Sequence, residues 1–103
     1  MLFRVEMSEK AESQYDNILD YVANILRNEQ AVIAIMDDFD NAINTLEKMA
    51  DSFEYCTSIR LRKLELRKYH LDKHKYLLIY RIVNDVVIVE GMYHELQDYE
   101  NSF

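Results

Sequence analysis

The cationic side chains of this 103-residue chain are concentrated in about one quarter of its length. Residues 58–81 carry 8 basic and 2 acidic side chains. Residues 1–57 carry 4 basic and 12 acidic side chains, and residues 82–103 carry 5 acidic side chains and 0 basic ones. The basic side chains of the central segment, here called the basic strip, are Arg60, Arg62, Lys63, Arg67, Lys68, Lys73, Lys75 and Arg81. Such a strip can bind phosphate or an acidic partner. It can equally form the solvated face of strands and helices, and the spacing alone leaves both interpretations open.

The histidines and the cysteine do not form a recognisable catalytic or metal-binding pattern. His70, His74 and His94 lack the spacing to carboxylates that defines a metal site, and we expect each to be a surface histidine. Cys56 has Glu54 close by and no adjacent histidine, so its thiol pKa should be raised and the residue inert. No phosphate-binding loop, dinucleotide fingerprint, zinc-protease motif or nucleophile elbow occurs. We therefore expect neither a metal nor a cofactor.

The composition predicts one globular domain spanning residues 1–103. Half of the residues are apolar and 30% are charged, which excludes a disordered chain and a membrane span. A chain of this size has little room for a deep, enclosed catalytic cavity. The net charge of −7 argues against a general nucleic-acid coat. A single cysteine fits a reducing compartment, and the early charge of Arg4 does not fit a signal peptide, so we expect a cytoplasmic protein without membrane association.

The first half of the chain predicts a strand followed by two helices. Apolar and polar residues alternate over residues 2–7, as in a strand with one buried face. Ser8 offers an N-cap for a helix that ends near Arg27, and Asn28 either caps that end or begins the next helix. The second apolar stripe, with successive steps of three and one as on one face of a helix, covers residues 32–50. The short linker makes the two helices an antiparallel hairpin.

The second half predicts a loop followed by three strands. Residues 51–63 lack periodicity and should form a loop or short turn. The expected strands are residues 64–71, 75–83 and 86–93, with the turns Asp72-Lys73-His74 and Asn84-Asp85 between them. A two-residue turn at Asn84-Asp85 sets the register: Val83 faces Val86, Arg81 faces Ile88 and Ile79 faces Glu90.

This register divides the last two strands into two faces. The face expected to lie on the helices contains Tyr76, Leu78, Tyr80, Ile82, Val87, Val89, Gly91 and Tyr93. The other face contains Leu77, Ile79, Arg81, Val83, Val86, Ile88, Glu90 and Met92. It is more apolar than a solvated face of an antiparallel sheet, so we expect a tail or a partner protein to cover it.

The order of elements and several short motifs resemble the RelE/ParE family of type II toxin-antitoxin toxins, also called plasmid stabilization proteins. The motifs are Ser8-Glu9-Lys10-Ala11-Glu12, Leu66-Arg67-Lys68, the run from Lys73 to Ile82, Met92-Tyr93-His94 and Gln97-Asp98-Tyr99. The resemblance covers nearly the whole chain. It implies an α+β fold in which the N-terminal strand and a three-stranded antiparallel meander form one sheet beside the helical hairpin. It also implies a growth-inhibiting intracellular toxin, encoded beside an antitoxin that wraps it.

The resemblance leaves two kinds of target open. RelE-like toxins cleave mRNA in the ribosomal A site, whereas ParE-like toxins inhibit DNA gyrase and are not known to need a catalytic residue. In a nuclease, Arg67 and Arg81 would stabilise charge on the phosphate, and His94 or Tyr99 would move the proton. Alternatively, the two arginines only solvate the sheet and His94 caps the last strand.

Two departures from the family pattern favour the ParE-like branch. Glu95, Leu96 and Gln97 stand where many members carry arginines between the tail histidine and its aspartate, and Leu77 replaces a frequent strand arginine. The loss of these cations weakens phosphate binding, and the acidic tail repels RNA. We expect an inhibitor of an essential target such as DNA gyrase rather than an enzyme. A ribosome-dependent mRNA endoribonuclease and a degenerate member that only binds antitoxin remain as alternatives.

The expected partners are the cognate antitoxin and either gyrase or ribosome-bound mRNA. The chain would form a homodimer or a toxin-antitoxin hetero-oligomer. The antitoxin should cover the groove beside the helical hairpin or the apolar outer face of the sheet. The residues that favour the outer face are Ile79, Val83, Val86, Ile88 and Met92.

Overall fold

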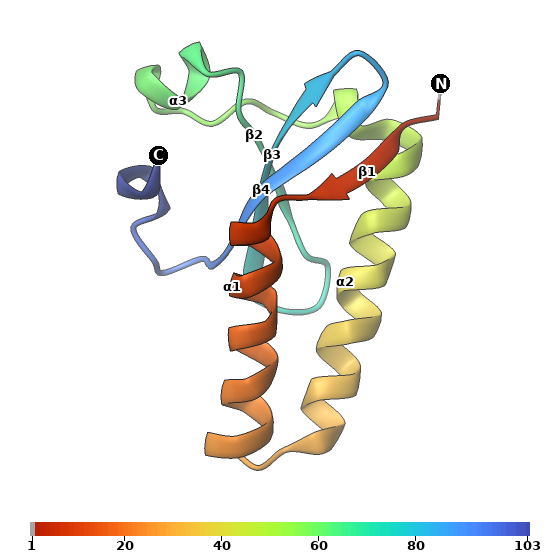
Figure 1. The fold of residues 1–103 in the computed structure, drawn as a ribbon, viewed down its shortest axis with the longest axis vertical. Coiled ribbons are helices and arrows are strands. Elements are labelled where there is room, and N and C mark those ends of the chain that lie inside the picture. The colour runs from red at the N-terminus through yellow and green to blue at the C-terminus, as the bar shows by residue number, and fades with distance from the viewer. Residues whose placement is uncertain (1) are drawn as a thin grey trace.

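The computed structural model describes residues 2–103 as a four-stranded sheet with a helical hairpin on one face (Figure 1). The elements are β1 (Arg4–Met7), α1 (Glu9–Asp20), α2 (Glu29–Met49), α3 (Ile59–Lys63), β2 (Arg67–His70), β3 (Tyr76–Val83) and β4 (Val86–His94). The strand order is β1-β4-β3-β2; β1 runs parallel to β4, and the other neighbours are antiparallel. This confirms the predicted α+β arrangement. No helix of the described residues is long and apolar enough to cross a bilayer.

Local capping explains where the two long helices begin. The Ser8 hydroxyl accepts a hydrogen bond from the Ala11 N–H at 3.0 Å, and the Asn28 side chain accepts one from the Ala31 N–H at 3.0 Å. Asn28 is therefore the N-cap of α2. The backbone of Arg27 has φ 51, which separates the helices. The first helix does not continue regularly to Arg27 as predicted, because residues Tyr21–Ile25 form a π-helical turn.

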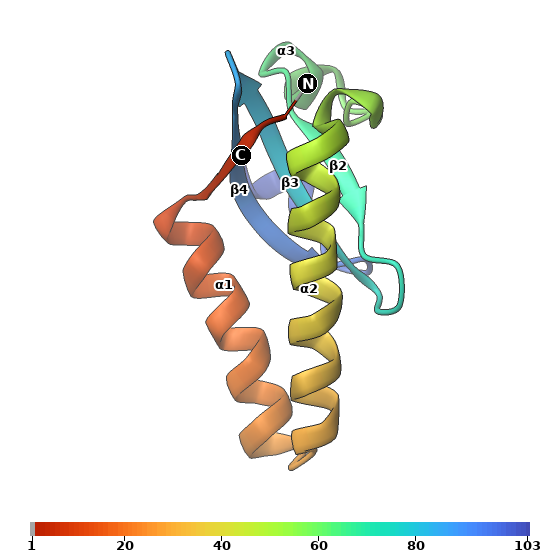
Figure 2. The same cartoon turned by 90° about the vertical axis from the view of Figure 1, so that its right-hand side faces the viewer.

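The helical hairpin extends beyond the sheet. Figures 1 and 2 show α1 and α2 side by side, with their connection far from the strands. Only the sheet-proximal part of the hairpin covers the sheet, and several apolar side chains near its free end stay exposed. These are Tyr21, Ile25, Leu26, Ile33 and Met36.

The β3–β4 hairpin follows the predicted register only in part. Asn84 has φ 58, as the two-residue turn requires, and Val83 pairs with Val86. The predicted pairing of Ile79 with Glu90 is wrong: Ile79 pairs with Gly91, because a β-bulge lies between Ile79 and Tyr80. The extra residue is Glu90 of β4, and it reverses which face the side chains of β4 point to beyond the bulge.

The bulge moves residues 91–93 of β4 to the faces opposite those predicted. Met92 packs in the core beneath the helices, whereas Tyr93 packs on the other side of the sheet. A Cβ atom on Gly91 would lie 2.5 Å from the Tyr93 ring, so Gly91 shares that outer face and leaves room for the ring. A larger residue at this position would force the buried Tyr93 ring to shift.

Both faces of the sheet carry an apolar core. The core between sheet and hairpin contains Phe3, Ala11, Phe39, Ala42, Leu46, Ala50, Tyr69, Leu71, Leu78, Tyr80, Val87, Val89 and Met92. The outer core contains Cys56, Leu61, Leu66, Leu77, Ile79 and Tyr93, with Tyr99 and Phe103 packed against it. α3 and the C-terminal segment thus cover the outer face (Figure 1), which confirms the expected covering tail.

The segment before β2 is more ordered than predicted. Residues 59–63, expected in a loop, form α3, which is too short to show helical periodicity. The expected strand over residues 64–71 is reduced to β2, because Glu65 adopts φ 59 in the turn after α3. An isolated bridge joins Tyr55 to Arg67, so residues 54–56 run along the edge of β2.

Candidate functional site

Arg67 holds the segment after α2 against the sheet. It lies opposite Tyr80, on the face that packs against the helices. Its Nη1 donates to the backbone oxygens of Phe53 at 2.6 Å and Asp51 at 3.3 Å, and its Nη2 donates to the Tyr55 hydroxyl at 2.9 Å. The guanidinium also lies 4.0 Å from the centre of the Tyr55 ring. Groups of the chain itself therefore occupy much of its hydrogen-bonding capacity.

Arg81 lies on the opposite face of the sheet and forms an ion pair. Its Nε is 2.7 Å from Oε2 of Glu90, the extra residue of the bulge. The two side chains are 40% and 26% exposed. The carboxylate therefore competes with a phosphate for the positive charge of the arginine, while the guanidinium stays partly accessible.

His94 and Tyr99 also belong to different surroundings. His94 pairs with Tyr76 at the end of β4; its N–H donates to Gln97 Oε1 at 2.7 Å, and its Nδ1 accepts from the Leu96 N–H at 3.1 Å. The residue thus organises the turn after β4. Tyr99 packs beside Tyr93 in the outer core, and burial raises the pKa of its hydroxyl.

The structure does not bring the four predicted catalytic side chains together. Arg67 and His94 share the helix-facing side, but they lie two strands apart and four residue pairs apart along β3, about 16 Å by strand geometry. Arg81 and Tyr99 lie on the other side. General acid–base catalysis requires its groups within hydrogen-bond reach of one reacting centre. Their catalytic roles remain a prediction.

The rest of the basic strip is divided between two ends of the sheet. Arg60, Arg62 and Lys63 lie on α3, whereas Lys73 and Lys75 lie in the β2–β3 connection at the far end of β2 (Figure 1). Arg60 donates to the backbone oxygens of Glu100 and Phe103 and so fastens the C-terminal segment.

Two further members of the strip bind neighbours along the edge of the sheet. Lys68 on β2 lies 3.7 Å from Glu54. The guanidinium carbon of Arg62 lies 5.5 Å from the Tyr55 ring. Several cations of the strip therefore contact groups of the chain itself.

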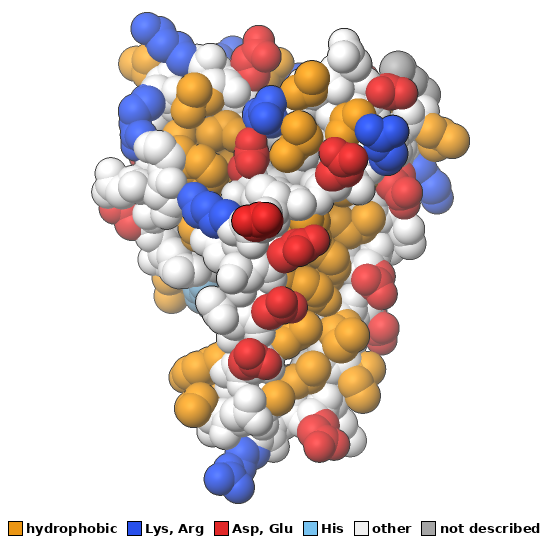
Figure 3. Space-filling model, in the orientation of Figure 1, with side chains coloured by type: hydrophobic (Ala, Val, Ile, Leu, Met, Phe, Trp, Pro, Cys, Tyr) orange, Lys and Arg blue, Asp and Glu red, His pale blue; other side chains and the backbone are white. Residues whose placement is uncertain are grey.

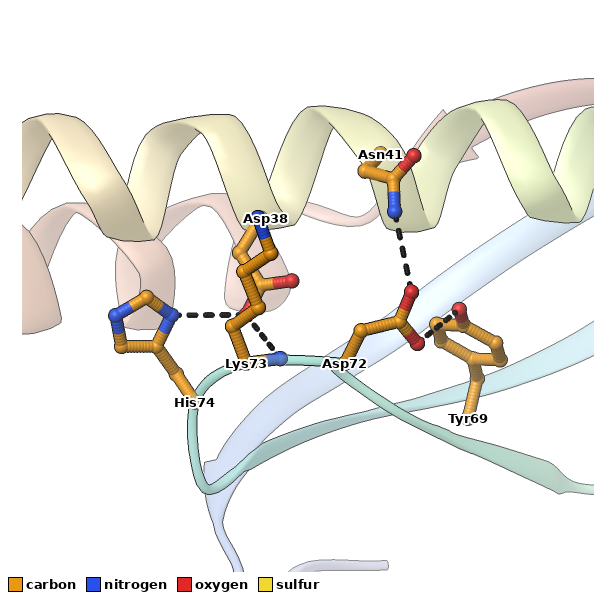
Figure 4. Close-up of polar contacts among 6 residues, drawn as sticks. All are labelled: Asp38, Asn41, Tyr69, Asp72, Lys73 and His74. Atoms are coloured by element: carbon orange, nitrogen blue, oxygen red, sulfur yellow. Dashed lines mark hydrogen bonds and ion pairs between the residues drawn. The ribbon is translucent and has the colours of Figure 1, made fainter.

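A polar cluster that the sequence did not indicate fastens the β2–β3 connection to α2 (Figure 4). Asp38 of α2, whose side chain is 1% exposed, lies 2.8 Å from His74 Nδ1 and accepts from the Lys73 N–H at 3.0 Å. Asp72 accepts from Asn41 at 3.2 Å and from the Tyr69 hydroxyl at 3.1 Å. We call the Asp38 contacts the Asp38–His74 tether. His74, expected at the surface, is therefore partly buried and bonded.

A cavity of about 380 Å³ lies between α1 and the ends of β3 and β4. Its lining residues are Gln14, Asn17, Ile18, Tyr21, Tyr76, Met92, His94 and Gln97, and we call it the α1 pocket. Gln14 accepts a hydrogen bond from the Met92 N–H at 2.9 Å, which fixes α1 to β4 at the pocket floor. Burial, and to a smaller extent the neighbouring Tyr21, raises the pKa of Tyr76.

Among the residues of the α1 pocket, the sequence predicted functional roles only for His94, as a proton-transfer residue, and for Met92, as part of an antitoxin surface on the other face of the sheet. The remaining lining residues come from α1, the π-helical turn after it, β3 and the turn after β4, which only the fold brings together. The π-helical turn that contains Tyr21 has no sequence signal of the kind used for caps and strands.

The described residues hold no cluster of three or more side chains suited to a metal ion. The buried Cys56 has a raised thiol pKa, as predicted, although burial rather than Glu54 is the main cause. A raised thiol pKa leaves little thiolate for nucleophilic attack.

Comparison with known proteins gives a family match and a structural match. The model of a family described as "ParE toxin of type II toxin-antitoxin system, parDE" matches residues 5–99. A solved chain described as the chromosomal ParDE TA system from P. aeruginosa has a TM-score of 0.73 and 14% sequence identity, with 90% of this chain and 96% of that chain covered. At this identity the structural likeness shows a shared fold. No curated protein sequence matches this chain.

Proposed function

The chain belongs to the ParE toxin family of type II toxin-antitoxin systems, and from this we propose that it blocks DNA gyrase by binding it, without cleaving RNA. The observation that carries the proposal is the dispersal of the residues that RNA cleavage would need. Arg67 and Arg81 lie on opposite faces of the sheet, and each is bound by groups of the chain itself. An inhibitor that acts by binding another protein needs a complementary surface, and it does not need catalytic side chains gathered at one reacting centre.

The family also supports a cognate antitoxin as partner. Of the two antitoxin surfaces predicted from sequence, the outer sheet face is the weaker, because Ile79 is buried in the outer core and Met92 lies beneath the helices. Only Val83, Val86 and Ile88 of that set remain at least partly exposed. We therefore place the antitoxin in the groove beside the helical hairpin.

Supercoiling by purified gyrase tests the proposal. Adding the purified chain should lower the supercoiling of relaxed plasmid in a concentration-dependent way, and adding the cognate antitoxin should restore it. The same preparation added to translating ribosomes should leave the mRNA intact. Unchanged supercoiling in clear molar excess of the chain would contradict the proposal.

One observation favours the endoribonuclease as a second candidate: the Arg81 side chain is still 40% exposed. If it binds a phosphate during cleavage, Arg81→Ala should slow codon-specific cutting of ribosome-bound mRNA by about 5- to 150-fold, the loss expected for one group that stabilises the transition state. Arg67→Ala should then also lower cleavage. Cutting that depends on these arginines would promote the nuclease and reject the gyrase proposal.

A further inference from the structure

β1 forms an open edge of the sheet. The strand order places it at one end, with β4 as its neighbour on the inner side. Figure 1 looks onto this edge, with β1 in front of β4 and no other element crossing before it. The backbone N–H and C=O groups of an unpaired edge strand can bind the strand of another chain. This edge is therefore a surface on which a further strand can pair.

The backbone groups of Val5 and Met7 point outward from this edge. The N–H groups of Arg4 and Ser8 each donate to a backbone oxygen of the β3–β4 hairpin at 2.9 Å, so alternate residues of β1 face the sheet. The residues between them direct their N–H and C=O groups to the opposite side. Within the described part of the chain, the N–H groups of Val5 and Met7 have no acceptor. The free edge begins after Phe3, whose N–H donates to α2 at 2.7 Å.

Two opposite charges lie on the outer face of β1. The side chains of Arg4 and Glu6 are 71% and 56% exposed and lie 3.6 Å apart. Val5, between them in the sequence, packs toward the helices instead. Charged side chains on an edge strand often prevent pairing. Here their opposite signs on either side of Val5 make the strand complementary to a second copy of itself that runs antiparallel.

An apolar hollow lies beside this strand on the helix face. Its volume is about 480 Å³, and its lining residues are Val5, Met7, Phe39, Asp40, Ile43 and Asn44. Val5 and Met7 are only half-buried. Figure 3, in the same view as Figure 1, shows apolar side chains gathered below this edge and between the two helices. Apolar side chains of a second strand would find apolar neighbours there.

We propose that two copies of the chain associate through antiparallel pairing of their β1 strands, a contact that we call the β1 seam. The twofold axis passes beside Val5, so the two Val5 residues face each other and exchange N–H···O=C hydrogen bonds. Arg4 of each copy then faces Glu6 of the other copy on the outer face. Parallel pairing in the same register would place Arg4 opposite Arg4, so the charges select the antiparallel orientation. The seam does not depend on the target of the toxin.

Sedimentation equilibrium of the purified chain over a range of concentrations tests the β1 seam. We expect a weak monomer–dimer equilibrium, because a strand of 4 residues buries a small area. Arg4→Glu should weaken dimerisation by about tenfold or more, since it places like charges opposite each other twice per dimer. Glu6→Arg should weaken it similarly. Both side chains are exposed, so the variants should melt close to the wild-type temperature.

Restoring the complementary charges gives the sharpest test. The double variant Arg4→Glu/Glu6→Arg should dimerise as the wild type does, because every facing pair again has opposite charges. An equimolar mixture of the two single variants should also form dimers, since each charge of one variant faces the opposite charge of the other. A double variant that dimerises no better than the single variants would reject the antiparallel seam.

Matched controls come from the free end of the hairpin. Arg27 and Glu29 are exposed, carry the same two charges and are likewise two residues apart. Arg27→Glu and Glu29→Arg should leave dimerisation unchanged. If these controls weaken the dimer while the β1 variants do not, the contact lies at the hairpin and the seam is rejected.

Amide hydrogen exchange locates the contact within the strand. The Val5 and Met7 amides should exchange quickly in dilute solution and more slowly as the concentration of the chain rises. The Glu6 amide, which faces β4, should not change. A chain that stays monomeric at its highest soluble concentration, or a dimer in which the Val5 and Met7 amides still exchange quickly, would overturn the proposal. Protection of these amides that requires added antitoxin would assign the edge to that partner and equally reject a second copy.

Discussion

At the scale of single residues, an arginine of the basic strip has contacts in the structure that differ from the role that the sequence suggests for it. Arg67 was a candidate for phosphate binding, yet its guanidinium donates to two backbone oxygens and a tyrosine hydroxyl. A planar guanidinium with several donors is well suited to bridge such acceptors. We therefore assign Arg67 a structural role, which is to hold residues 51–55 on the edge of the sheet.

Substituting Arg67 should lower stability. Arg67→Ala leaves the Phe53 backbone oxygen without its short bond, and we expect a loss of about 1.5–3 kcal/mol, the range for hydrogen bonds to charged groups. The free energy of unfolding of Arg67→Lys should lie between those of Arg67→Ala and wild type, because lysine keeps the positive charge but lacks the planar group that donates several hydrogen bonds. Urea unfolding measures the effect, with the exposed Lys63→Ala as control. An Arg67→Ala protein of unchanged stability that has lost its toxicity would assign the guanidinium to function instead.

At the scale of elements, the Asp38–His74 tether connects α2 to the start of β3. Asp38→Ala leaves the Lys73 N–H and His74 without their partner, which should cost about 1–3 kcal/mol. The Lys73 amide should also exchange its hydrogen faster, because the connection is released. The neighbouring Asp37→Ala, on the exposed side of α2, should change neither quantity. Equal exchange rates in the two variants would show that the tether is dispensable.

The elements also show which features the sequence could and could not predict. Ser8 and Asn84 were predicted from local chemistry, a cap and a positive φ, and both were confirmed. The bulge at Ile79 was missed because it depends on how the whole sheet packs on both faces, and a local pattern has no signal for it. The tether was missed because Asp38 and His74 are 36 residues apart.

The same limit applies to the candidate site. The sequence predicted the cationic and proton-transfer residues by type, and only the fold shows that Arg67 and Arg81 point to opposite faces. The sequence predicted a groove beside the helical hairpin, but not the residues of the α1 pocket, because its walls come from helix and strand segments that are far apart in the chain.

At the scale of the whole molecule, charge is distributed in a way that suits protein partners. Arg60, Lys68 and Arg81 bind groups of the chain itself, whereas the hairpin carries an excess of exposed acidic side chains. With a net charge of −7, the surface repels RNA and attracts basic segments within a screening length of about 8 Å. This distribution is consistent with the proposal that the chain acts by binding a protein.

The order of events after induced expression in bacteria tests the central claim most directly, that this ParE-family toxin acts on gyrase and not on mRNA. Protein synthesis, plasmid supercoiling and the DNA-damage response are followed together from the moment of induction. The account predicts that supercoiling falls and the DNA-damage response rises while protein synthesis continues at first. Protein synthesis that stops first, with mRNA cut within codons, would contradict it.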